Sequence, residues 1–222
     1  MADNGCCSAS SEQCCLKNIF LKACEENDLE KVKACLKLGV DPNIKSSDGR
    51  EDFGLNYASW KNLPDLCDIL LSQPTIDVNN KDEFGWTALM DSCYHGHSKI
   101  TEKLVKVPGI ELNSQNDFGC TAAIYAAWNN SFRCLNVLAK LEDVDWNIKN
   151  KNGHTVAHCA AVFCNRETVK MLMDIRKIDW NIKCPSGNSA LSEALKINES
   201  DNVKMLLGRY MYSQVYWFQP CD

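Results

Sequence analysis

Residues 82–97 read Asp82-Glu-Phe-Gly-Trp-Thr-Ala-Leu-Met-Asp-Ser-Cys-Tyr-His-Gly-His97. Thr87 stands directly before an apolar stretch that ends at Gly96. A hydroxyl side chain before such a stretch and a glycine after it are start and stop signals of a short helix. A second helical pattern follows over residues 97–105, with its apolar residues on one face. The segment therefore predicts a helix, a turn and a second helix.

The same pattern recurs along the chain at a fixed interval. A hydroxyl residue lies two positions after a glycine at Thr87, Thr121, Thr155 and Ser189, each 34 residues after the last. A second marker, an asparagine that closes an Asp-x-Asn or Glu-x-Asn triplet, recurs with the same interval at Asn79, Asn113, Asn147 and Asn181. Two markers in one register predict an all-α solenoid, because such units bury their apolar faces only by stacking.

The segment 82–97 resembles the ankyrin repeat signature, and the segment Asn27-Asp-Leu-Glu-Lys-Val-Lys-Ala-Cys-Leu-Lys-Leu-Gly-Val-Asp-Pro-Asn43 resembles the second helix and exit of an ankyrin unit. The resemblance covers roughly residues 16–207. It implies about six helix-turn-helix units joined by hairpin-like finger loops. It also implies a concave groove, lined by the fingers and the first helices, in which such proteins bind another protein.

We predict three regions. Residues 1–15 are expected to form a flexible Cys-rich tail, and residues 208–222 an aromatic segment that caps the stack or binds a partner. Between them, the expected units are 16–46, 47–80, 81–114, 115–148, 149–182 and 183–207. The first and last units depart from the pattern, as terminal units with solvent-facing sides must.

Composition narrows the function classes. The net charge of −5 disfavours nucleic-acid binding, because DNA and RNA backbones are anionic. No stretch is long and apolar enough for a membrane span, and the first residues do not resemble a secretory signal. We expect a monomer in the cytoplasm, with the nucleus as the alternative.

The chain has 14 cysteines. Six occupy helical positions where alanine or leucine would also fit, and we expect them to be buried, reduced thiols: Cys24, Cys35, Cys67, Cys93, Cys134 and Cys159. Four others form doublets near the N-terminus, Cys6-Cys7 and Cys14-Cys15. These are incidental thiols of a tail, sites of acylation or redox chemistry, or ligands of a soft metal.

Catalysis is not indicated. Phosphate-loop, nucleophile-elbow and paired-histidine zinc patterns are absent from the sequence. His97 and His158 occupy positions where the resemblance implies structural hydrogen bonds. His95 and Cys93 lack the spacing of a four-ligand site. We expect no enzyme, no metal and no cofactor; the competing enzyme hypothesis requires a thiol of lowered pKa in a pocket.

The groove slots implied by the resemblance carry many aromatic residues, including three of the six tryptophans. Trp and Tyr bury a large area at small entropic cost and dominate binding hot spots. The predicted partner-binding residues are Trp60, Phe84, Trp86, Tyr94, His95, Asp117, Phe118, Trp128, Asn129, His154 and Phe163. The alternative is that these rings pack between neighbouring fingers. Trp146 and Trp180 stand in a different slot, which we expect to be buried.

The leading hypothesis is a protein-protein interaction module, an adaptor or stoichiometric inhibitor that holds a protein ligand in the groove. The alternative is a substrate-recognition or regulatory subunit attached to a larger complex through its C-terminal tail. The resemblance further implies hydroxylation of Asn79, since the segment from Leu71 to Asn79 matches the Leu-x-x-x-x-x-Asp-Val-Asn preference of an asparaginyl hydroxylase that modifies ankyrin repeats.

Overall fold

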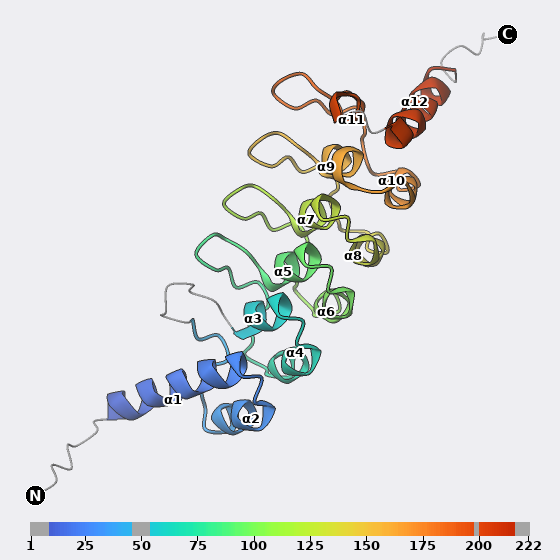
Figure 1. Cartoon of the computed structure of the whole chain (residues 1–222). Coiled ribbons are helices and arrows are strands. Elements are labelled where there is room, and N and C mark those ends of the chain that lie inside the picture. Colours follow the sequence, from blue (N-terminus) through green and yellow to red (C-terminus); the bar gives the residue numbers. More distant parts are fainter. Residues whose placement is uncertain (1–8, 46–53, 198–199, 216–222) are drawn as a thin grey trace, which may run out of the picture.

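The computed structural model describes residues 9–45, 54–197 and 200–215. In these residues the chain forms twelve helices and no strand, arranged as a row of helix pairs (Figure 1). The helices are α1 (Ala9–Glu25), α2 (Leu29–Lys37), α3 (Gly54–Trp60), α4 (Pro64–Leu71), α5 (Ala88–Tyr94), α6 (Ser98–Leu104), α7 (Ala122–Trp128), α8 (Phe132–Leu138), α9 (Val156–Phe163), α10 (Arg166–Met173), α11 (Ala190–Ile197) and α12 (Ser200–Val215). The prediction of an all-α repeat solenoid is confirmed.

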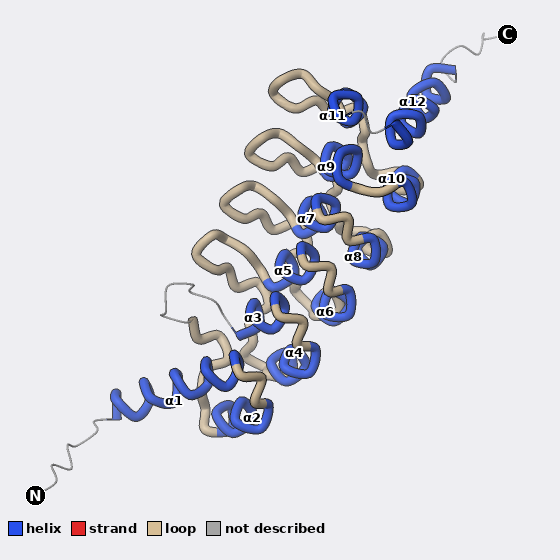
Figure 2. The backbone as a smooth tube through the Cα atoms, in the orientation of Figure 1, coloured by secondary structure: helices blue, strands red, loops and turns tan. Residues whose placement is uncertain are grey.

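The helix pairs stack into two layers. The first helices α3, α5, α7, α9 and α11 contact one another in succession, and the second helices from α2 to α8 form a parallel outer layer. Loops project beyond the first helices, on the side away from the outer layer (Figure 2). These finger loops are bonded to each other: the amide of Asp117 donates to the carbonyl of Phe84 at 3.0 Å, and that of Lys151 to Phe118 at 3.0 Å.

Threonine side chains begin the first helices. The Thr87 hydroxyl accepts a hydrogen bond from the Met90 amide at 3.4 Å, and the Thr121 hydroxyl accepts from Ile124 at 3.3 Å. These bonds satisfy amide donors that have no partner within the helix. The marker threonines of the sequence therefore fix where each inner helix starts.

The core lies between the two layers. Leu89, Ile100 and Leu135 are fully buried there, and the buried alanines of α7 let adjacent inner helices approach closely. All six helical cysteines that we expected to be buried are buried and free. Trp146 and Trp180 are 2% and 7% exposed. The expected burial of both groups is confirmed.

The two ends differ from the predicted boundaries. Residues 9–15, expected to belong to a flexible tail, are helical, because α1 begins at Ala9. No glycine or proline interrupts α1, and its many good helix formers sustain it. At the other end α12 runs past the predicted boundary at residue 207 to Val215. Asn202 ties α12 to the fifth unit by donating to the carbonyl of Cys164 at 2.9 Å.

Two histidines have the structural role that we expected. The ring of His97 contacts the carbonyl of Trp60 through Nε2 at 3.1 Å. In His158, Nδ1 accepts from the Thr155 amide at 3.2 Å, and Nε2 lies 3.2 Å from the carbonyl of Asn188. Since Nδ1 accepts, the proton of the neutral His158 ring is on Nε2, which donates to the next unit.

This burial makes the stability of the fold depend on pH. Desolvation lowers the pKa of His158 below its usual value of about 6.5. As the pH falls through this value, the unfolded chain takes up a proton that the folded chain excludes, so the free energy of unfolding decreases. We expect the urea midpoint to fall between pH 7 and pH 5, and to fall less in His158→Gln. An equal fall in both proteins would contradict this role.

Candidate functional site

A groove runs along the inner helices, beside the fingers. It consists of three adjoining hollows, of about 340, 400 and 270 Å³. The first two share Trp86 and Tyr94, and the last two share Trp128, so the hollows are continuous. We define the aromatic groove by six of the rings that line these hollows: Trp86, Tyr94, Phe118, Tyr125, Trp128 and Phe163.

Five of the six rings of the aromatic groove, all but Phe118, form a contacting row. Trp86 stacks on Tyr125, with centroids 4.1 Å apart, and Tyr125 lies 6.5 Å from Trp128. Trp128 in turn stacks on Phe163 at 5.6 Å. Side chains from α7, from α9 and from the finger loop that precedes α5 thus meet, although they are far apart in the sequence. The stacking orders the rings before any ligand arrives, which lowers the entropic cost of binding.

Several of the rings that line the three hollows face water. Phe84, Phe118, Trp128 and Phe163 are 50%, 55%, 43% and 48% exposed. Trp60, Trp86 and Tyr94 are half-buried. The half-buried rings partly serve packing, which agrees with the alternative that these rings pack between neighbouring fingers. Among the exposed rings, Trp128 stacks on Phe163 and lines the second hollow together with Phe118. Exposed apolar surface of this kind marks interaction sites in soluble proteins.

Tyr125 is the groove residue that the sequence prediction missed. Its hydroxyl accepts from the Asn116 side chain at 2.7 Å, and burial raises the pKa of its phenol. At the equivalent position the other units carry Tyr57, Asp91, Cys159 and Glu193, each 34 residues after the last with Tyr125 in the middle. A large ring between a unit with Asp91 and a unit with Cys159 was the signal that would have found it.

The four polar residues predicted for the site lie in different places: two are exposed, one joins two units, and one lines the third hollow. His95 and Asp117 are exposed near the first two hollows. The Asn129 side chain donates to the carbonyl of Tyr94, which joins the turns of two units. His154 lies farther along, in the third hollow. Trp60 stands at the opposite end, with its ring against Lys61 and Tyr57.

The first hollow is acidic as well as aromatic. Asp82, Glu83 and Asp91 line it together with Trp60 and Trp86. Desolvation raises the pKa of the Asp82 carboxyl, although amide donors from Trp86 and Phe84 counteract this. The structure therefore offers carboxylates beside aromatic faces, a combination suited to a cationic side chain.

In the loops that follow the second helices, asparagines join consecutive units. The Asn113 side chain donates to the carbonyl of Asp143 at 2.7 Å and accepts from the amide of Asp145 at 2.8 Å. Asn43, Asn79 and Asn147 make equivalent pairs of bonds to the unit that follows each of them. The asparagine marker of the sequence is thus a ladder between repeats.

Removing one ladder step has a defined cost. We expect Asn113→Ala to lower the free energy of unfolding by about 1–2 kcal/mol, because it removes two inter-repeat hydrogen bonds. Asn181→Ala is the matched control, since the described residues show no such bonds from the Asn181 side chain; its change should stay within about 0.5 kcal/mol. Chemical denaturation measures the free energy of unfolding of both variants. An equal decrease in the two would contradict a stabilising role for the asparagine bonds between units.

The described thiols are mostly unreactive. Burial raises the pKa of Cys24, Cys67, Cys159 and Cys164 to about 12. Cys15 is exposed. Cys6 and Cys7 lie outside the described residues, as does the Cys14 side chain, so the fate of the N-terminal doublets stays a prediction. Within the described part, no helix is long and apolar enough to cross a membrane.

Comparison with known proteins agrees with this architecture. The family model described as ankyrin repeats (3 copies) matches residues 19–116, 55–149 and 125–215. Among solved structures, the ankyrin repeat protein EF0377 aligns with a TM-score of 0.77 at 23% identity, over 85% of this chain and 96% of that one. The likeness to EF0377 concerns the fold.

Two curated relatives share part of the repeat region. Over 100 residues the chain is 31% identical to the SMC5-SMC6 complex localization factor protein 1 of Mus musculus. Over 99 residues it is 27% identical to the probable E3 ubiquitin-protein ligase XBOS32 of Oryza sativa subsp. japonica. Each alignment covers 45% of this chain, but only 9% and 18% of those relatives.

Proposed function

Since the chain belongs to the ankyrin-repeat family, whose repeats are general protein-protein interaction modules, we propose that it is an adaptor or stoichiometric inhibitor without catalytic activity. It holds one protein ligand in the aromatic groove. The observation that carries this proposal is the row of contacting rings from Trp86 to Phe163, of which Trp128 and Phe163 face water.

The lining suggests the chemistry of the ligand. The middle hollow offers Phe118 and Trp128 to apolar side chains, while Asp82, Glu83 and Asp91 favour a basic residue at the first hollow. The ligand segment we propose therefore combines aromatic or aliphatic anchors with a lysine or arginine. Such anchors supply most of the affinity of a protein interface.

A second candidate is a recognition or regulatory subunit that attaches to a larger complex through its C-terminal region. Exposed apolar residues support it: Leu195, Ile197 and Leu207 are 55%, 52% and 42% exposed on the last helix pair. They are placed where the chain continues into residues 208–222. A partner covering this end would leave the aromatic groove free for a substrate.

One capture experiment separates the two candidates. The wild-type chain and Trp86→Ala/Trp128→Ala are used to capture proteins from cell extract, with and without an excess of free peptide 208–222. Capture that is lost in the double variant and unaffected by the peptide supports the groove. Capture that survives in the double variant and is displaced by the peptide supports attachment through the tail and contradicts the groove proposal.

We propose that the chain acts as a monomer in the cytoplasm, with the nucleus as the alternative. The free state of all described cysteines fits a reducing compartment. The net charge of −5 fits a protein that does not bind nucleic acid. Fractionation and light scattering would test both points.

Hydroxylation of Asn79 belongs to the same proposal. Its side chain is a ladder step, donating to the carbonyl of Gly109 at 2.8 Å and accepting from Glu111 at 2.9 Å. We expect the peptide containing Asn79 to gain the mass of one oxygen atom after incubation with an asparaginyl hydroxylase. The peptide containing Asn113 is the control, because Val105 replaces the leucine of the preferred sequence. An unchanged mass for Asn79 would end the idea.

A further inference from the structure

Three metal-ligating side chains meet at the last two fingers. The ring of His154, the thiol of Cys184 and the carboxylate of Glu193 place their ligand atoms within 4.8 Å of one another. We propose that these three residues bind a zinc ion, with one coordination position left open toward the groove. The proposal does not depend on the groove binding a protein.

The repeat geometry explains why these side chains meet. His154 is 34 residues after Cys120 and 68 after Trp86; Glu193 is 34 after Cys159 and 68 after Tyr125. In the earlier units, equivalent positions are also neighbours. Trp86 stacks on Tyr125 at 4.1 Å, and the Cys120 thiol accepts from Asn150 at 3.7 Å. The juxtaposition is thus set by the stacking of the units, and among the described residues only these three equivalent positions bring histidine, cysteine and glutamate ligand groups together.

The backbone around Cys184 presents two amide donors. Cys184 takes the place that Asp82, Asn116 and Asn150 have in earlier fingers. There the side-chain oxygen accepts two amide protons, as Asn150 does from Asn152 at 3.0 Å and from His154 at 2.9 Å. A sulfur in this place meets the same amide donors.

Hydrogen-bonding groups surround the Cys184 thiol. The Ser186 hydroxyl lies 3.0 Å from Sγ, and the amides of Ser186 and Asn188 also donate to it. Zinc binds the thiolate form. Binding therefore releases the thiol proton to solvent, and the bond that forms is between Sγ and zinc.

The ligand atoms lie slightly farther apart than they would around a bound zinc ion. Sγ lies 4.0 Å from Oε1 of Glu193. In a tetrahedral zinc site with bonds of about 2.0–2.3 Å, ligand atoms lie about 3.3–3.8 Å apart. Small rotations of the half-buried His154 and Glu193 side chains supply the difference. Lys196 contacts the same Oε1 atom at 3.4 Å, so zinc would replace this ion pair or be bound by the other carboxylate oxygen.

The two fingers are close enough to hold the ligands in register. A Cβ atom on Gly153 would lie 2.2 Å from Pro185, so the backbone before His154 touches the residue after Cys184. His154 and Glu193 also line the third hollow, whereas Cys184 is buried behind them. An open fourth position therefore faces the groove, where a water molecule or a side chain of a ligand would complete the coordination.

Cobalt binding tests the site. We expect the full chain with Cys6, Cys7, Cys14 and Cys15 changed to serine to bind one Co²⁺, with the visible bands of tetrahedral cobalt and a near-ultraviolet thiolate-to-cobalt band. Cys184→Ser should remove the thiolate band, and His154→Ala should weaken binding at least tenfold. Cys164→Ser and His95→Ala are the matched controls and should bind as before.

A second readout guards against misfolded variants. Zinc should raise the melting temperature of the four-serine protein and leave that of His154→Ala unchanged, while circular dichroism reports that each variant is folded. The proposal is overturned if the four-serine protein shows no thiolate band. It is equally overturned if the band persists in Cys184→Ser.

Discussion

The Trp86→Ala/Trp128→Ala variant should bind the protein ligand of the groove at least about 100-fold more weakly than wild type. Each tryptophan is a large ring in a hollow, and truncation of such a hot-spot residue costs about 2 kcal/mol or more. Trp86 stacks on Tyr125 and Trp128 on Phe163, so the double change interrupts the row of rings at two places. A 100-fold loss corresponds to about 2.7 kcal/mol.

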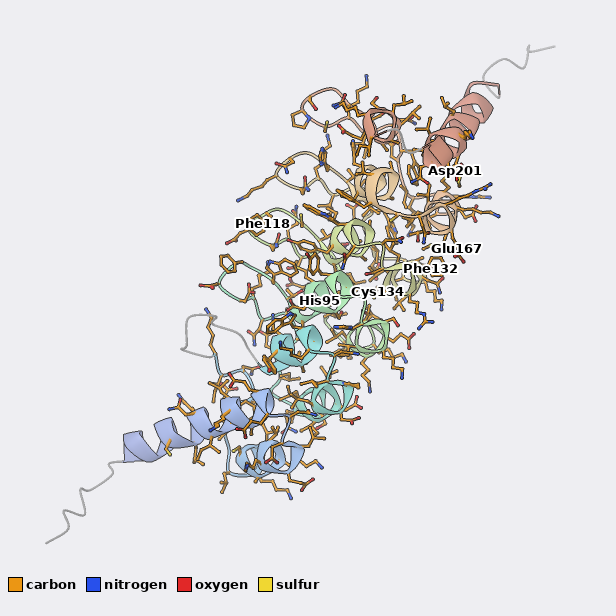
Figure 3. All side chains as sticks on the ribbon, viewed as in Figure 1. His95, Phe118, Phe132, Cys134, Glu167 and Asp201 are labelled. Carbon is orange, nitrogen blue, oxygen red and sulfur yellow. The ribbon has the colours of Figure 1, made fainter. Side chains whose placement is uncertain are left out.

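The control for this variant lies on the opposite face. Phe132 begins the outer helix α8, and Phe118 lies on the finger side, as Figure 3 shows. Phe132→Ala removes an aromatic ring without touching the groove, so its affinity should stay within about threefold of wild type. Isothermal titration with the captured ligand measures both variants. A double variant that binds as tightly as Phe132→Ala would show that the rings are structural.

Gly153→Ala should lower the free energy of unfolding by at least about 2 kcal/mol. Gly153 has a φ of +75°, and the left-handed conformation costs an alanine about 1–2 kcal/mol. The new Cβ would in addition lie 2.2 Å from Pro185, so the last two fingers would have to separate. Urea denaturation followed by circular dichroism gives the loss.

Gly187→Ala separates the two contributions. Gly187 has nearly the same conformation, with a φ of +79°, but nothing lies within 4 Å of an added Cβ. Gly187→Ala should therefore lower the free energy of unfolding only by the cost of the left-handed backbone conformation, about 1–2 kcal/mol. If both variants lose the same stability, the contact between the fifth and sixth fingers does not contribute, and the account of finger packing is wrong.

The sequence was sufficient for the fold because its signals are local and repeated. A threonine that caps a helix acts within three residues, and an asparagine that joins one unit to the next must recur once in every unit, so their interval of 34 reports the architecture directly. The burial of Trp146 and Trp180 followed from their slot in the repeat, which other units fill with Val78 and Leu112.

The sequence was insufficient where contacts join different units. The prediction did not include Tyr125, because its place in the groove depends on its stacking on Trp86, a residue 39 positions away. The meeting of His154, Cys184 and Glu193 follows no ligand spacing, since it depends on the register in which one finger packs on the next. The helical start of α1 at Ala9 was missed because a polar, Cys-rich segment gives no apolar periodicity.

The central claim is that a protein ligand lies in the groove, and photo-crosslinking locates it directly. A photoreactive phenylalanine analogue is placed at Phe118, in the aromatic groove, or at Phe132, on the outer layer (Figure 3). The account predicts that the ligand is crosslinked from position 118 and not from position 132. A crosslink from position 132 alone would place the ligand on the outer helices and contradict the account.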